Sequence, residues 1–394
     1  MIAPDSRAFI LLLGAVAMLT SLAVDMSLPT LPSLATDFAA SPETVQLTLS
    51  LFFIGYAAGQ LLYGPVSDRF GRRRVLLGGL GLFTLAGFLC AASWRIDALI
   101  AFRLVHGLSA ASGPVLARAV VRDHFGGARA AQGLSAVLAV MSVAPLVAPY
   151  LGGLLLTFFG WRTVFLTLGF LGLALLAVTW TGLAESLKHP DAQALHPWRL
   201  IANYRSFFTS PISLGYTFVN AIGFFGLFAF ISGSPFVLIE VYGVRSDRFG
   251  IYYGLTALGL TLGSIANSRL VRRFSIDGMI TLGFVILLAA GAALVAAGWM
   301  RWGGPWGITL PLTVFSFGLA LLMPNATAAA IEPLPHMAGT AVSILGATQM
   351  ATASIAGYIV NRLYDRTPMP MAWCILLPAA AAFALYLLFV RRKA

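Results

Sequence analysis

Two oppositely charged residues lie inside long apolar stretches of the chain. Asp25 is close to the end of the first apolar run, and Arg103 follows a few apolar residues into the fourth. A charge at the bilayer centre costs about 2.5–3.5 kcal/mol on insertion scales, so such residues normally face a cavity or a partner. Because a nearby guanidinium lowers the pKa of a carboxylate, the pair is compatible with a site that binds and releases a proton. The alternatives are that Asp25 caps a loop in interfacial water and that Arg103 extends its head group outward to water.

His106 is a third candidate for proton chemistry. It follows Arg103 by three residues, so the two side chains and Gly107 share one helical face. Histidine titrates near neutral pH, which would allow it to take part in coupling. The alternative is a histidine that only makes a hydrogen bond. Since spans 1 and 4 are antiparallel, we expect Asp25 and Arg103 to lie toward the same half of the membrane.

A polar segment at residues 64–75 separates two apolar runs, and we expect a tight turn in water there. Gly64 and Gly71 permit turns that other residues resist, and a proline follows Gly64. Four arginines, residues 69 and 72–74, place the segment on the cytoplasmic side, because basic loops stay inside. Asp68 among these arginines needs a partner or a helix N-terminus. A merely basic inside loop would explain the arginines alone.

The fifth apolar run contains two prolines followed by two glycines, Pro145, Pro149, Gly152 and Gly153. Each proline removes a backbone hydrogen bond and kinks a helix. The glycines allow a second helix to approach closely. The pattern predicts a hinge.

The elements that must position these residues are membrane-spanning helices. The chain of 394 residues is 59% hydrophobic and only 10% charged, and a bilayer core needs about 20 apolar residues per helix. The sequence predicts an all-α membrane protein with twelve transmembrane helices and no soluble domain. Apolar runs of spanning length occur at 8–28, 45–63, 76–93, 98–117, 130–156, 162–183, 211–234, 249–267, 277–299, 305–324, 338–361 and 370–390.

The net charge of +11 does not require nucleic acid as a partner. Most of the 25 lysines and arginines fall on one side if the spans alternate, which predicts that both termini are cytoplasmic. The remaining consequence is some affinity for anionic membrane lipid. The two cysteines lie within apolar runs and show no metal-site or disulfide spacing, so we expect no metal and no cofactor.

The longest polar interval divides the chain nearly in half. It predicts an N-terminal six-helix bundle over 1–183, a cytoplasmic linker over 184–210 and a C-terminal six-helix bundle over 211–394. Polar and aromatic residues within several spans are candidates for a substrate cavity, with ordinary packing or lipid contact as the alternative. These candidates are Ser21, Tyr56, Gln60, Asn220, Phe224, Phe228 and Gln349.

Three motifs resemble those of the major facilitator superfamily. Its signature loop, G-x-x-x-D-R-x-G-R-R, is matched by Gly64, Asp68, Arg69, Gly71, Arg72 and Arg73. Its intramembrane R-x-x-Q-G pattern is matched by Arg103 and Gly107, with His106 in place of Gln. The antiporter motif G-P-x-x-G-G is matched by Pro149, Gly152 and Gly153, with Ala148 in place of the first Gly. The segments 25–32, 46–50 and 234–236 resemble the Bcr/CflA branch of the twelve-span drug:proton antiporters.

The resemblance implies two six-helix bundles around a central cavity. It also implies proton-driven export of small drugs across the bacterial inner membrane by a monomer that is not an enzyme. Asp25 would then be the proton site, with Arg103 modulating it. The low number of carboxylates in the spans favours neutral or weakly charged substrates.

Two rival functions remain. One is a proton-coupled symporter that takes up a metabolite on the same fold. The other is a membrane enzyme or sensor, for which the chain shows no nucleophile constellation, metal cluster or output domain. The chain also has no phosphate-binding loop of the Walker type, which argues against ATP as the energy source.

Overall fold

The computed structural model describes residues 2–4, 6–194, 207–271, 273–333 and 338–390. Within these ranges the secondary structure is helical, without strands, and twelve helices are long and apolar enough to cross a membrane. The predicted all-α membrane fold with twelve spans is therefore confirmed. The basic residues at 391–393 and residues 195–206 of the expected linker lie outside the described ranges.

The chain forms two compact units, Met1–Leu200 and Ile201–Ala394. The division falls within the polar interval 184–210, and each unit contains six of the twelve candidate spans.

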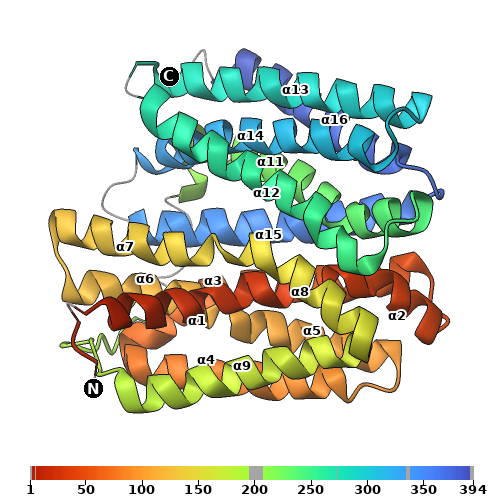
Figure 1. Ribbon diagram of the computed structural model, residues 1–394. Coiled ribbons are helices and arrows are strands. Elements are labelled where there is room, and N and C mark those ends of the chain that lie inside the picture. Colours follow the sequence, from red (N-terminus) through yellow and green to blue (C-terminus); the bar gives the residue numbers. More distant parts are fainter. Residues whose placement is uncertain (1, 5, 195–206, 272, 334–337, 391–394) are drawn as a thin grey trace. The chain divides into compact units, whose positions relative to one another are not determined.

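In the N-terminal unit, α3 packs against α5, α4 against α9, and α1 against both α6 and α7 (Figure 1). Its elements are α1 (Arg7–Asp25), η1 (Leu28–Thr30), α2 (Leu31–Asp37), α3 (Pro42–Phe70), α4 (Arg72–Ala91), α5 (Ile96–Ala110), α6 (Ser112–His124), α7 (Gly127–Met141), α8 (Ala144–Phe159) and α9 (Trp161–Gly182).

In the C-terminal unit, α13 and α12 both pack against α14, and α11 packs against α15 (Figure 1). Its elements are α11 (Pro211–Pro235), η2 (Phe236–Val241), α12 (Ser246–Leu270), α13 (Ile276–Met300), α14 (Gly304–Ile331), α15 (Ala338–Arg362), α16 (Met369–Leu385) and η4 (Tyr386–Val390). The segments η2 and η4 are π-helical turns that continue α11 and α16.

Several helices begin with a serine whose side chain accepts a backbone N–H. Ser41 accepts from the N–H of Thr44 and precedes Pro42, which occupies the first turn of α3. Ser210 and Ser275 cap α11 and α13 in the same way. Serine before the first turn satisfies donors that the helix leaves open, which explains why these spans begin where they do.

The first span is broken directly after Asp25. There α1 ends, and the 3-10 turn η1 leads into α2. The hydroxyls of Ser27 and Thr30 donate to the carbonyls of Val24 and Ser27, at 2.8 and 2.7 Å. Because these hydroxyls compete for backbone acceptors and Pro29 has no N–H, the regular helix cannot continue through this turn.

The expected turn at Gly64 is wrong. The helix α3 continues through Gly64 and Pro65 to Phe70, and the chain reverses only at Gly71. Gly71 has a φ of 96°, a conformation that glycine adopts without strain. Proline is tolerated inside a membrane helix where neighbouring groups satisfy the freed carbonyl, which explains why Pro65 does not end α3.

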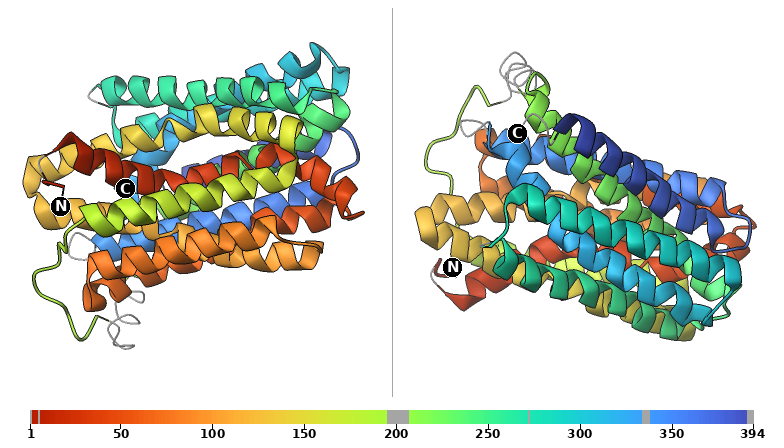
Figure 2. Two further views of the ribbon diagram at one scale, coloured as in Figure 1. Left: turned by 60° about the horizontal axis from the view of Figure 1, so that its bottom comes forward. Right: turned by 90° about the horizontal axis from the view of Figure 1, so that it is seen from above.

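The first residues of the chain lie at the same end of the N-terminal unit as the end of α9. The N–H of Ile2 donates to the carbonyl of Gly182 at 2.7 Å. The chain leaves α9 at this end as an extended segment (Figure 2). Six spans connect Ile2 to Gly182, and an even number of spans brings the chain back to the end of the unit at which it started.

Candidate functional site

The guanidinium of Arg103 is fully buried in the N-terminal unit. Its Nη1 donates to the carbonyl of Ala23 at 3.2 Å, and its Nε donates to the carbonyl of Thr48 at 3.3 Å. It also lies over the ring of Phe52, 4.3 Å from the centroid. A buried cation is costly unless it is hydrogen-bonded, and here acceptors and a π face from α1 and α3 surround it. Arg103 thus lies in the core and does not reach outward to water.

Asp25 is the last residue of α1 and is 5% exposed. The Arg103 side chain makes two contacts with the segment around Asp25, one on each side of Asp25 in the sequence. They are the Ala23 carbonyl and the Ser27 hydroxyl, which accepts from Nη2 at 3.4 Å. The structure therefore brings the side chain of Arg103 to the segment that carries Asp25. Burial disfavours the alternative in which Asp25 caps a loop in interfacial water.

His106 is also fully buried, and its Nδ1 lies 3.3 Å from Nη1 of Arg103. Since a guanidinium can only donate, Nδ1 must accept, which makes the ring neutral with its hydrogen on Nε2. Nε2 has no hydrogen-bond partner among the described residues, and the ring packs on Phe83 with centroids 4.3 Å apart. In this arrangement His106 serves as an acceptor for Arg103, in agreement with the simpler of the two expectations.

The proline- and glycine-rich fifth span lies directly against the turn after Asp25. The span is divided, because α7 ends at Met141 and α8 begins at Ala144, with Pro145 in its first turn and Pro149 inside it. A Cβ at Gly152 would overlap the carbonyl oxygen of Met26. Gly153 is buried on the same helix. The glycine of the antiporter motif therefore permits backbone contact with the residue that follows Asp25.

Arg72 connects the segments around the turn between α3 and α4. Its Nη1 donates to Oδ1 of Asp68 and to the hydroxyl of Ser67, both at 2.6 Å. Its Nε donates to Oδ2 of Asp123, at the end of α6, at 3.1 Å. The ion pairs thus hold α3, α4 and α6 together at one end of the unit.

The other motif residues near this turn make different contacts. Arg69 is exposed, with its guanidinium 5.3 Å from the ring centroid of Phe70. Arg73 donates from Nη2 to the carbonyl of Trp180, in α9, at 2.6 Å. Gly64, inside α3, has open space around it.

Glu185 is a functional candidate that the sequence interpretation missed. Its carboxylate accepts from the backbone N–H groups of Arg72 at 2.8 Å and Arg73 at 3.1 Å, so it caps the N-terminus of α4. The next residue, Ser186, donates from its hydroxyl to Oδ2 of Asp123 at 2.8 Å. The sequence does show an acidic residue just after the sixth apolar run. Its partner, the backbone N–H of Arg72, is 113 positions away, so the sequence alone does not indicate the contact.

The candidate cavity residues of the N-terminal unit lie on α1 and α3. Tyr56 and Gln60 are buried, and Ser21 is half-buried. Tyr56 lies beside Gln60 and Thr20.

In the C-terminal unit, Asn220 is fully buried and connects three helices. Its Nδ2 donates to Oγ1 of Thr327 at 2.8 Å, and its Oδ1 accepts from Nε2 of Gln349 at 2.6 Å. Phe224 and Phe228 stack with ring centroids 5.6 Å apart. The structure thus brings together Asn220 with Gln349, and Phe224 with Phe228. The contacts of Asn220 fit helix packing, which was the alternative to a substrate contact.

Comparison with known proteins identifies similar chains over nearly the whole length. The model of the Major Facilitator Superfamily matches residues 13–357. A bicyclomycin resistance protein homolog from Haemophilus influenzae is 32% identical over 381 residues, covering 96% of this chain and 96% of that protein. Multidrug resistance protein D from Escherichia coli is 30% identical, covering 82% of this chain and 80% of that protein. A chloramphenicol resistance protein from Pseudomonas aeruginosa is 27% identical, covering 94% and 88%.

Solved structures show the same fold. The xylose transporter XylE from Escherichia coli, in a partially occluded inward open conformation, matches with a TM-score of 0.76. It is 15% identical, and the match covers 97% of each chain. At this identity the likeness concerns the fold alone.

The contact at Gly152 predicts that a single methyl group there destabilises the protein. We expect Gly152→Ala to lower the free energy of unfolding by about 1–3 kcal/mol, because the new Cβ overlaps the Met26 carbonyl. Gly78→Ala, in open space on α4, is the matched control and should be neutral or stabilising. Thermal unfolding in detergent provides the comparison. Equal stability of the two variants would contradict the close contact.

The hydrogen bond between Arg103 and His106 predicts different effects for two substitutions. His106→Gln keeps an acceptor and should retain most of the stability. His106→Leu leaves a buried guanidinium N–H without this acceptor and should cost about 1–3 kcal/mol more. The measurement is again thermal unfolding of the purified variants. A glutamine variant as unstable as the leucine variant would show that the acceptor is not what matters at this position.

Proposed function

This chain belongs to the major facilitator superfamily, and we propose that it is a proton-coupled exporter of small, largely apolar drugs or toxic metabolites. The observation that carries the proposal is the similarity, over 96% of both chains, to a bicyclomycin resistance protein homolog. The likeness to proteins named for multidrug and chloramphenicol resistance points to the same substrate class. Export would proceed by alternating access, without a cofactor, in a monomer of the bacterial inner membrane with both termini in the cytoplasm.

The proposed proton site is Asp25, with Arg103 as the residue that modulates it. A proton on Asp25 cancels its attraction to a nearby cation, so loading and release change the forces on the turn that both residues share. Gly152 touches the same turn, which supports a link between proton binding and movement of the kinked α8. His106 is held as a neutral acceptor by Arg103, so we assign it a supporting role.

The proton gradient supplies enough energy for this cycle. One charge moving through a potential of about 150 mV provides roughly 3.4 kcal/mol, which corresponds to a drug gradient of about 300-fold. We expect the substrate site to be largely apolar. By sequence, Asp25 is the only acidic residue that lies inside an N-terminal span and away from an obvious loop. This composition favours neutral or weakly charged substrates.

The direction of transport is tested by drug susceptibility in an efflux-deficient bacterial host. Expression of the chain should lower intracellular drug and raise the tolerated concentration of some compounds in a panel that includes bicyclomycin and chloramphenicol. A protonophore should restore accumulation. Continued export after collapse of the gradient, with ATP still present, would exclude proton coupling. Accumulation of a metabolite in place of drug exclusion would identify the rival, a proton-coupled symporter.

The role of Asp25 is tested by proton release from purified protein when drug is added. Asp25→Asn mimics the protonated side chain, so it should abolish gradient-driven export and proton release while leaving the protein inserted. Asp97→Asn is the control, because Asp97 is an exposed carboxylate in the first turn of α5. If Asp25→Asn releases protons as the wild type does, coupling resides elsewhere, and His106→Gln is the next variant to measure.

A further inference from the structure

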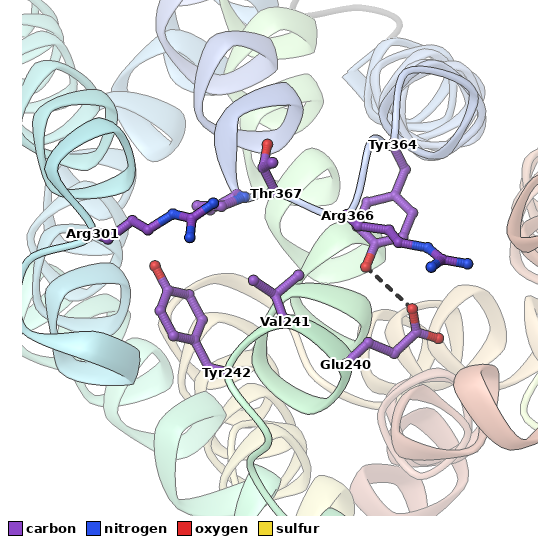
Figure 3. Close-up of a pocket in the computed structure, with 8 residues that line it drawn as sticks. Glu240, Val241, Tyr242, Arg301, Tyr364, Arg366 and Thr367 are labelled. Carbon is purple, nitrogen blue, oxygen red and sulfur yellow. Dashed lines mark hydrogen bonds between the residues drawn. The ribbon is translucent and has the colours of Figure 1, made fainter.

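A cavity of about 560 Å³ opens at one end of the C-terminal unit. It is lined by Glu240, Val241 and Tyr242 at the end of η2, by Arg301 after α13, and by residues of the turn between α15 and α16 (Figure 3). All of these residues belong to one unit, and none is part of the proposed proton site. The volume falls in the range of small-molecule sites, about 300–1,000 Å³.

Two hydrogen-bond donors face each other across one side of this cavity. The guanidinium of Arg301 and the hydroxyl of Tyr242 point toward one another (Figure 3). The Tyr242 hydroxyl is buried without a hydrogen-bond partner, and the Arg301 side chain forms no hydrogen bond or ion pair with the described residues. Burial raises the pKa of Tyr242, so its hydroxyl remains a donor at neutral pH. The Tyr242 oxygen can accept from a guanidinium, but the Tyr242 O–H has no acceptor, and a charged oxygen between the two groups would accept from both of them.

The backbone at this cavity is held in an unusual conformation. Among the described residues, only Ala39, Arg301 and Arg366 combine a positive φ with a side chain larger than hydrogen, and two of these three line the cavity. The φ of Arg301 is 50° and that of Arg366 is 61°. Glycine would adopt these angles without strain. Arg301 is the C-cap of α13, a position where helices commonly end in this conformation and where glycine is the usual residue, so arginine there carries a cost.

The acidic groups around the cavity do not neutralise these arginines. Glu240 accepts from the Tyr364 hydroxyl at 3.1 Å, at the other side of the cavity (Figure 3). Asp365 accepts from the backbone N–H and the hydroxyl of Thr367, at 3.0 and 2.5 Å, within its own turn. Neither carboxylate forms an ion pair with Arg301 or Arg366 in the described part of the chain. The side of the cavity at Arg301 therefore carries a cation that has no ion-pair partner among the described residues.

The residues beside Arg301 place it at the membrane surface. Trp299, Met300 and Trp302 are 77%, 74% and 75% exposed, and they lie on both sides of Arg301 in the chain. Tryptophan is enriched where the bilayer meets water, at the level of the lipid head groups. Phosphate is the anionic group that occurs there in every phospholipid.

We infer that this cavity binds a phosphate ester, with its oxygens accepting from Arg301 and Tyr242. A phospholipid head group is the source that the exposed tryptophans favour. A soluble phosphate ester such as glycerol phosphate would satisfy the same donors. The site is independent of drug export, so its test does not depend on the function proposed above.

The lipid is tested by native mass spectrometry of the full-length protein released from vesicles that contain phosphatidylglycerol. Arg301→Gly should weaken retention of this lipid about tenfold or more, because a charged hydrogen bond is lost. Tyr242→Phe should weaken it by a smaller factor. Arg248→Gln is the control, because Arg248 is exposed at the same end of the unit and does not line the cavity.

A second measurement separates binding from folding. Arg301→Gly should melt at the same temperature as the wild type or higher, because glycine relieves the positive φ. A lower melting temperature with unchanged lipid retention would show that Arg301 is only structural and would overturn the proposal.

A third measurement identifies the source of the phosphate. Calorimetric titration of lipid-free protein in detergent with glycerol 1-phosphate should show weak binding or none if the head group of a lipid is the ligand. Tight binding that depends on Arg301 and Tyr242 would support the site and assign it to a soluble phosphate ester. Failure of both the lipid and the soluble ester to bind in an Arg301-dependent way would refute the site.

Discussion

The N-terminal unit depends on the burial of one guanidinium. Arg103 has no exposed surface, so each of its donors must find an acceptor inside the protein. One acceptor is the carbonyl of Ala23 in the last turn of α1, where helix carbonyls lack partners within the helix. The break of the first span after Asp25 therefore frees the oxygen that Arg103 uses. The same break places Asp25 between the two residues of this segment, Ala23 and Ser27, that Arg103 contacts.

This arrangement connects charge to helix packing. The turn after Asp25 contacts Arg103 on one side, through Ser27, and Gly152 of α8 on the other, through Met26. A change of charge at Asp25 alters the electrostatic forces on this turn. The turn packs directly against α8, because the Met26 backbone lies close to Gly152. In our proposal this contact is the route from proton binding to the kinked helix. In the same proposal, the change in charge at Asp25 shifts the turn, and the contact between Met26 and Gly152 passes this shift to α8.

The two units hold their helices together with different chemistry. In the N-terminal unit, Arg72 forms ion pairs with Asp68 and Asp123, and Glu185 caps the helix that Arg72 begins. In the C-terminal unit, Nδ2 of Asn325 donates to Oδ1 of Asn267 at 2.7 Å. An ion pair between partly exposed groups weakens with salt and with protonation, whereas an amide pair does not. The contacts of Arg72 in the N-terminal unit should therefore depend more on salt concentration than the Asn325–Asn267 hydrogen bond.

The sequence by itself determined the twelve spans, because membrane thickness sets helix length and apolar runs of that length are visible in one dimension. The sequence also identified Asp25 and Arg103 as candidate site residues, because charged residues within apolar runs are rare. Only the tertiary structure decided that His106 is an acceptor, that Asn220 hydrogen-bonds to two other helices and that α3 continues through Pro65 to Phe70. It alone revealed Glu185 and the cavity at Arg301. Each of these depends on partners far away in the chain, and hydrogen bonds between distant residues leave no periodic pattern that a single sequence shows.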